Sequence, residues 1–136
     1  MTEQELKART KKIAIDIAKL SARLDNNRIN NTYIGQILRS SSSIGANYRA
    51  ACRAKSIKDF VYKLQVVEEE TDETMFFLEL LAVFNEKYKA EMRVIYRETE
   101  VVLRVIVASI KTVYRKMNTH GLEKTKTKNL KTKING

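Results

Sequence analysis

Apolar side chains recur at alternating intervals of three and four residues along four separate stretches of this sequence. At this period successive side chains fall on one face of an α-helix, so each stretch predicts an amphipathic helix. The expected core positions, helix by helix, are Leu6, Ile13, Ile17, Leu20 and Leu24; Ile34, Leu38, Ser41, Gly45, Tyr48 and Cys52; Phe60, Leu64, Val67, Thr71, Thr74 or Met75, Leu78 and Leu81; and Met92, Ile95, Thr99, Val102, Ile106, Ser109 and Val113.

Short polar stretches separate the four segments, at residues 25–31 (DNNRINN), 54–56 (AKS) and 85–89 (NEKYK). Links of this length make neighbouring helices antiparallel. The chain has no proline and only four glycines, which argues against sheets with tight turns. We therefore expect an all-α fold, an antiparallel up-down-up-down four-helix bundle over residues 1–117. Residues 118–136 lack an apolar pattern and are expected to form a disordered, lysine-rich tail.

Residues 39–60 (RSSSSIGANYRAACRAKSIKDF) place four consecutive serines beside a Gly-Ala pair. The stretch stays in phase with the apolar positions on either side and lacks the Gly-rich spacing and GK[ST] motif of a phosphate-binding loop. It is therefore predicted to be helical, with small side chains that let a neighbouring helix approach closely. Ser56 and Asp59 have the spacing of an N-cap and its acidic partner, which places the start of the third helix there.

Residues 43–81 (SIGANYRAACRAKSIKDFVYKLQVVEEETDETMFFLELL) carry a resemblance to a known family. They resemble small bacterial four-helix-bundle proteins related to those encoded in the intervening sequences of large-subunit ribosomal RNA, a family that includes the accessory variability determinant of diversity-generating retroelements. Many relatives have proline where this chain has Gly45 and an acidic residue near Arg49 or Ala50. The resemblance implies a non-enzymatic protein, a ring-like homo-oligomer that is pentameric in the retroelement branch, and nucleic acid or a nucleic-acid enzyme, such as a reverse transcriptase, as partner.

Charge is distributed unevenly along this basic chain, whose formal net charge is +10 and whose pI is about 9.8. Residues 57–86 carry 2 basic and 8 acidic groups, so the third helix is acidic among basic neighbours. One interpretation is that its acids pair with arginines on adjacent helices; the other is that it docks a basic partner or a second subunit. The acids concerned are Glu68, Glu69, Glu70, Asp72 and Glu73.

A stripe of cations is predicted on the fourth helix. At 100° per residue its members fall within about 40° of one another and opposite the apolar face. The stripe is either an ordinary solvated face or a surface that follows a nucleic-acid backbone, and four cations of the second helix and the turn after it could add to it. The stripe residues are Arg93, Arg97, Arg104, Lys111 and Arg115, and the four additional candidates are Arg39, Arg49, Arg53 and Lys55.

The residue types in this sequence do not support a catalytic site or a metal site. A di-iron bundle needs Glu-x-x-His pairs on two helices, and the chain's one histidine is His120 in the predicted tail. Zinc sites lack cysteine and histidine ligands, and Cys52 falls in phase with the apolar face, where a thiol is inert. We therefore expect no enzyme activity, no cofactor and no metal. The N-terminus has no signal-peptide pattern and no segment is apolar enough to span a bilayer, which predicts a cytoplasmic protein without membrane association.

Two functional classes remain open. The first is an oligomeric accessory protein that binds RNA or DNA, and the alternative is an oligomeric adaptor that contacts only protein. Homo-oligomer formation is expected in both, because Phe76, Phe77, Phe84 and Val101 exceed the apolar surface that a monomeric bundle needs.

Overall fold

The computed structural model describes the backbone of residues 1–123 and the side chains of residues 1–119. It contains the helices α1 (Glu3–Arg23), α2 (Arg28–Cys52), α3 (Ile57–Phe84) and α4 (Lys89–Glu123), with a short 3₁₀-helix, η1 (Glu86–Tyr88), before α4. No strand occurs in this described part of the chain, which confirms the predicted all-α class.

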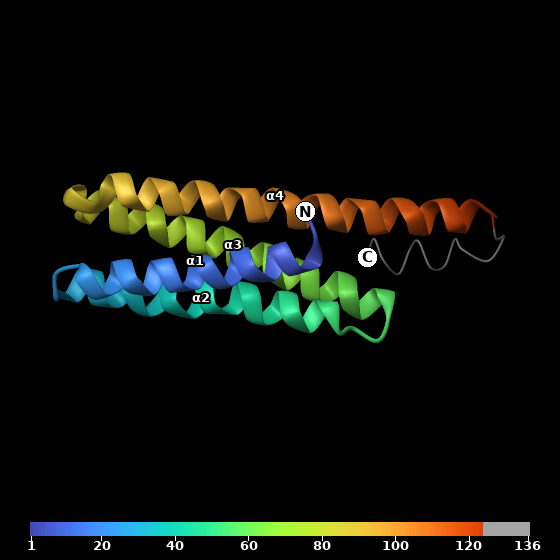
Figure 1. Ribbon diagram of the computed structural model, residues 1–136, viewed down its shortest axis with the longest axis horizontal. Helices are drawn as coiled ribbons and strands as arrows, with labels where there is room; N and C mark the ends of the chain where they lie inside the picture. The colour runs from blue at the N-terminus through green and yellow to red at the C-terminus, as the bar shows by residue number, and fades with distance from the viewer. Residues whose placement is uncertain (124–136) are drawn as a thin grey trace.

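The four helices form an elongated bundle in which consecutive helices run in opposite directions (Figure 1). Each helix packs against two others, α1 against α2 and α4, and α3 against α2 and α4. The 35-residue α4 is the longest helix, and it extends well past the turn that joins α2 to α3 (Figure 1). None of the helices in the described region combines the length and apolarity needed to cross a membrane.

Polar side chains set the start of three helices. The hydroxyl of Ser56 accepts a hydrogen bond from the backbone N–H of Asp59 at 3.0 Å, which confirms the predicted cap. Thr2 caps α1 in the same way. Asn27 caps α2, because its side-chain oxygen accepts a hydrogen bond from the N–H of Asn30 at 2.8 Å. The helix therefore begins at Arg28, and the prediction of a link over residues 25–31 is wrong for residues 28–31. An N-cap asparagine satisfies a free N–H of the first turn and lets the helix begin here.

The end of α4 also differs from the sequence prediction. The bundle was expected to stop at residue 117, but the helix continues to Glu123. No proline interrupts this stretch, and each residue that continues a helix adds one backbone hydrogen bond. The rest of the predicted disordered tail, residues 124–136, lies outside the described residues.

The core confirms the predicted positions of α1 but shifts the face of α2. All five predicted α1 residues are buried. In α2 the predicted Ser41 and Tyr48 are buried, but the fully buried Ile37 and Ile44 were not predicted and the predicted Leu38 is 37% exposed. The small residues of α2 differ little in hydropathy. The apolar pattern of the sequence therefore fitted two neighbouring orientations of this helix about its axis equally well. In α3, Val61 is buried, whereas the predicted Phe60 is partly exposed. In α4, Ile110 is buried, whereas the predicted Ser109 and Val113 are partly exposed.

Small side chains bring α1 and α2 close together. A Cβ atom added at Gly45 would lie 3.2 Å from the Thr10 hydroxyl oxygen of α1, a tight contact. On the other side of α2, the Ser40 and Thr74 hydroxyl oxygens are 2.9 Å apart in a buried contact with α3. These contacts confirm that the serine and glycine residues of α2 allow close helix packing.

A buried asparagine pair joins the first turn of α2 to the residue between α3 and η1, at one end of the bundle. The Asn30 amide donates to the Asn85 side-chain oxygen at 3.0 Å, and the Asn85 amide donates back to Asn30 at 2.8 Å. Each amide also donates to a backbone carbonyl, that of Asp25 or Leu81. The pair satisfies polar groups that would be costly to bury alone and holds the α1–α2 link against the end of α3.

Candidate nucleic-acid interface

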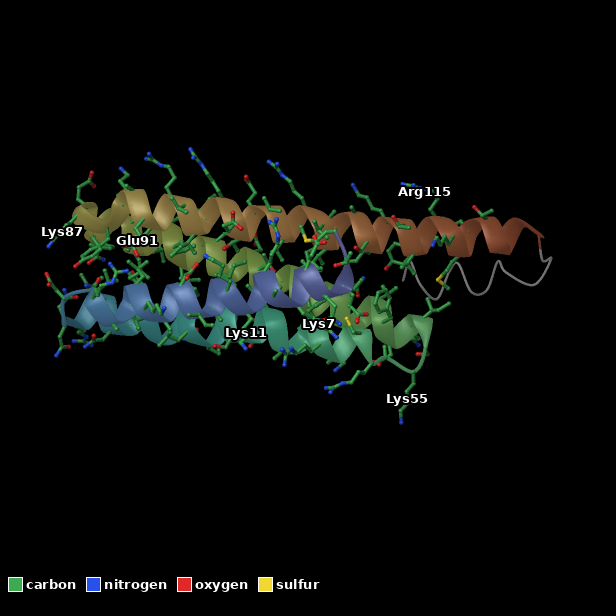
Figure 2. All side chains as sticks on the ribbon, in the orientation of Figure 1. Lys7, Lys11, Lys55, Lys87, Glu91 and Arg115 are labelled. Atoms are coloured by element: carbon green, nitrogen blue, oxygen red, sulfur yellow. The ribbon has the colours of Figure 1, made fainter. Side chains whose placement is uncertain are left out.

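The predicted cation stripe lies on the outer face of α4. Its five residues are all exposed, while Val102 and Ile106 on the opposite face are fully buried. Nitrogen-tipped side chains project from α4 away from the other helices, and Arg115 lies on this outer side of α4, level with the turn that joins α2 to α3 (Figure 2). From Arg93 to Arg115 the stripe is about 33 Å long at 1.5 Å per residue.

Most of the stripe is free of counter-charges, because the acids of α4 that could neutralise it pair largely with α1. Glu98 lies 3.7 Å from Arg9, and Glu91 pairs with Arg23, whose hydrogen bond lowers the pKa of the Glu91 carboxyl. Among the described residues, an acidic partner is present only for Arg104, which lies 3.4 Å from Glu100. The other stripe residues form no ion pair with any described residue; they are Arg93, Arg97, Lys111 and Arg115.

Arg39 belongs to a different environment. Its guanidinium contacts the Glu70 carboxylate at 3.1 Å and also pairs with Glu73. For Glu70 and Glu73, this confirms the interpretation that acids of α3 pair with arginines on adjacent helices. Glu68, Glu69 and Asp72 form no ion pair within the described part of the chain, so part of the acidic face of α3 stays open.

Arg49 and Arg53 line a groove of about 500 Å³ between α1 and α2. Lys7 and Lys11 line the same groove from α1, and neither was identified from the sequence. Both lysines are labelled in Figure 2, on the face of α1 that adjoins α2. The signal that could have found them is the antiparallel pairing, which places the N-terminal half of α1 beside the C-terminal half of α2.

Lys55 lies apart from the other candidates. It sits in the turn between α2 and α3, on the opposite side of the molecule from Arg115 (Figure 2). It lines a larger, mostly apolar groove of about 830 Å³ under the extended part of α4, together with Phe60, Val113 and Met117. The nine candidate residues therefore do not form one continuous surface.

Side chains with catalytic potential are few among the described residues. Cys52 lies in the larger groove, and burial raises the pKa of its thiol, which keeps the sulfur protonated and weakly nucleophilic at neutral pH. Burial likewise raises the pKa of the Tyr48 hydroxyl. Within the described residues, no group of three or more His, Cys, Asp or Glu side chains is arranged to hold a metal ion.

This chain matches a known protein family and resembles solved structures. The family described as "23S rRNA-intervening sequence protein" matches residues 2–108. A crystal structure described as a protein with unknown function from the S23 ribosomal protein family of Bacteroides thetaiotaomicron VPI-5482 is 30% identical, with a TM-score of 0.71. The similarity covers 82% of this chain and 99% of that one. No curated protein matches this chain.

Proposed function

Because the chain belongs to the 23S rRNA-intervening sequence protein family, we propose that it is a non-enzymatic, oligomeric accessory protein that binds the backbone of RNA or DNA. The observation that supports this best is the α4 stripe, where four of five exposed cations lack an acidic partner within the described chain. A solvated helix face normally mixes both signs of charge. A one-sided face attracts polyanions and releases their counterions on binding.

Recognition by this surface does not depend on the identity of the bases. The stripe is a straight row on a convex helix, and nothing in it matches a zinc finger, a basic zipper or another motif that reads a groove. Phosphate contacts position a protein on nucleic acid but carry no sequence information. A protein with this surface would help a nucleic-acid enzyme, such as a reverse transcriptase, by holding template or product rather than by choosing a sequence.

A salt titration tests this function. Mobility shifts with RNA and DNA should give affinities that depend little on sequence and fall steeply with salt. If all five stripe cations meet phosphates, the slope of log K against log salt should be about −4.5 on duplex DNA and about −3.5 on single strands, per subunit engaged. Absence of binding to either polymer at low salt would contradict the proposal and favour the alternative, an adaptor that contacts only protein.

Self-association forms part of the same proposal. Several large apolar side chains at the surface of α3 are more than half exposed, among them Tyr62 at 59%, Phe76 at 52%, Val83 at 72% and Phe84 at 51%. Phe77 and Val101, two other residues expected to contact a neighbour, are only partly exposed. Exposed apolar surface of this extent is characteristic of subunit contacts. A pentamer is suggested by resemblance to the accessory variability determinants.

Light scattering tests the assembly. At micromolar concentration we expect a mass that is a multiple of the 15.7 kDa chain, near five times that value for a pentamer. Phe76→Glu should lower the measured mass because it places a charge in the contact. Val94→Glu is the matched control, since Val94 is similarly exposed, at 61%, but lies on α4. If the parent protein were a monomer, the proposed homo-oligomer would be refuted. If both substitutions changed the measured mass equally, α3 would not form the subunit contact.

A further inference from the structure

We propose that the groove between α1 and α2 is a second nucleic-acid site, separate from the α4 stripe, and that it takes a single strand. The inference rests on the proposed function and adds to it a surface and a form of nucleic acid. The groove is lined by four cations, Lys7, Lys11, Arg49 and Arg53, and by five residues with short side chains that we call its floor, Thr10, Ala14, Ser42, Gly45 and Ala46.

The geometry of the groove follows from antiparallel packing. Lys7 and Lys11 are four residues apart on α1, and Arg49 and Arg53 are four residues apart on α2. Residues at this spacing lie on one helix face about 6 Å apart along the axis. Two rows of cations therefore flank a shared channel. The channel is hollow because its floor has only short side chains, with Gly45 directly against Thr10.

The charge of the groove is almost uncompensated. Lys7 pairs with Glu3 at 3.2 Å, but Lys11, Arg49 and Arg53 form no ion pair with any described residue. No acidic side chain of the described region lines the groove, and residues 39–58 contain none at all. Four cations thus face a common space without a counter-charge inside it.

Helix stability explains only half of this arrangement. Arg49 and Arg53 lie at the C-terminal end of α2, where cations interact favourably with the helix dipole. Lys7 and Lys11 lie in the N-terminal half of α1, close to the positive end of its dipole, and gain nothing from it. The pair with Glu3 accounts in part for Lys7, and the presence of Lys11 opposite the two arginines is accounted for by an anionic ligand that all four residues contact.

The side chains on the floor of the groove indicate which kind of molecule can bind there. A partner helix gains most of its affinity by burying large apolar side chains, and this floor offers only alanine, glycine, serine and threonine. The large exposed apolar residues lie elsewhere, chiefly on α3. A duplex presents a broad convex surface, which suits the outer stripe of α4 better than a narrow channel. A single phosphodiester strand is narrow, flexible and charged along its length, and it fits between the two cation rows.

Binding in this groove should be electrostatic and independent of sequence. Single-strand sites usually add aromatic side chains on which bases stack, and none of the described residues that line this groove is aromatic. Four phosphate contacts on a single strand would contribute about −2.8 to the slope of log K against log salt. Affinity for the groove alone should therefore vanish as salt rises.

The test compares Lys11→Glu/Arg49→Glu with the control Arg28→Glu/Lys58→Glu, which changes the net charge equally. Arg28 and Lys58 are exposed in the first turns of α2 and α3, where acids are tolerated, and neither lines the groove. The probes are an oligouridine of about 16 nucleotides and a DNA duplex of the same length. Circular dichroism verifies that each variant is folded, and Lys11→Gln/Arg49→Gln provides a milder version.

With the stripe removed in both variants by Arg97→Glu/Lys111→Glu, we expect the groove variant to bind oligouridine roughly 10- to 100-fold more weakly than the control variant at 50 mM salt, because each released counterion is worth close to one order of magnitude there. Its salt slope should flatten by about 1.4. Duplex affinity should match that of the control. Equal behaviour of both variants on oligouridine would overturn the second site while leaving the proposed function intact.

Two further outcomes also count against the inference. An equal loss on duplex and oligouridine would show that the groove does not distinguish a single strand. Binding of oligoglutamate that depends on Lys11 and Arg49, when oligouridine binding does not, would assign the groove to an acidic protein segment. Failure of the parent protein to bind any nucleic acid would instead refute the proposed function itself.

Discussion

Replacing Ile44 by alanine should destabilise the bundle by about 2 to 5 kcal/mol, whereas the same change at Leu38 should alter the free energy of unfolding by less than about 1 kcal/mol. Ile44 is fully buried, so truncation leaves a cavity that the close-packed surroundings cannot fill. Leu38 is 37% exposed and lies at the edge of the core. The pair therefore tests which face of α2 is buried.

Urea unfolding at one fixed subunit concentration provides the measurement, because self-association makes apparent stability depend on concentration. Cys52→Ala serves as a second comparison at a half-buried position of the same helix. If Leu38→Ala were the more damaging substitution, the face of α2 expected from the sequence would be correct and the register described above wrong.

Reversing two charges of the α4 stripe should weaken nucleic-acid binding strongly without affecting the fold. Arg97→Glu/Lys111→Glu alters two exposed side chains that form no ion pair with a described residue, so no intramolecular contact is lost. Removing two phosphate contacts should flatten the salt slope by about 1.8 on duplex DNA and about 1.4 on single strands, with an affinity loss of roughly 10- to 100-fold at 50 mM salt.

The controls separate the stripe from net charge and from the C-terminal segment. Arg28→Glu/Lys58→Glu carries the same charge change away from α4. Deletion of residues 124–136 leaves the whole of α4 in place and removes only lysine-rich sequence. If the stripe variant kept its affinity and slope while this deletion abolished both, the stripe would be an ordinary solvated face. An adaptor that contacts only protein would show no binding in any of these variants.

The candidate site shows how far charge patterns in a sequence can be interpreted. The periodicity of α4 placed all five stripe residues on one exposed face, because angular position on a single helix depends only on sequence spacing. It could not distinguish Arg39, which is held by Glu70 and Glu73, from Arg49, which has no acidic partner among the described residues. That difference depends on which residues a second helix brings within reach.

The sequence by itself determined the local features of this protein: four amphipathic helices, the cap at Ser56 and the absence of strands in the described region. These depend on residues within a few positions of one another. The tertiary structure alone decided the buried face of α2, the Asn30–Asn85 pair and the groove that unites Lys11 with Arg49. The small residues of α2 fit two rotations about its axis, and only packing between α1 and α3 selects one. The asparagines and the groove cations are tens of residues apart in the chain, so their contacts exist only once antiparallel helices have docked.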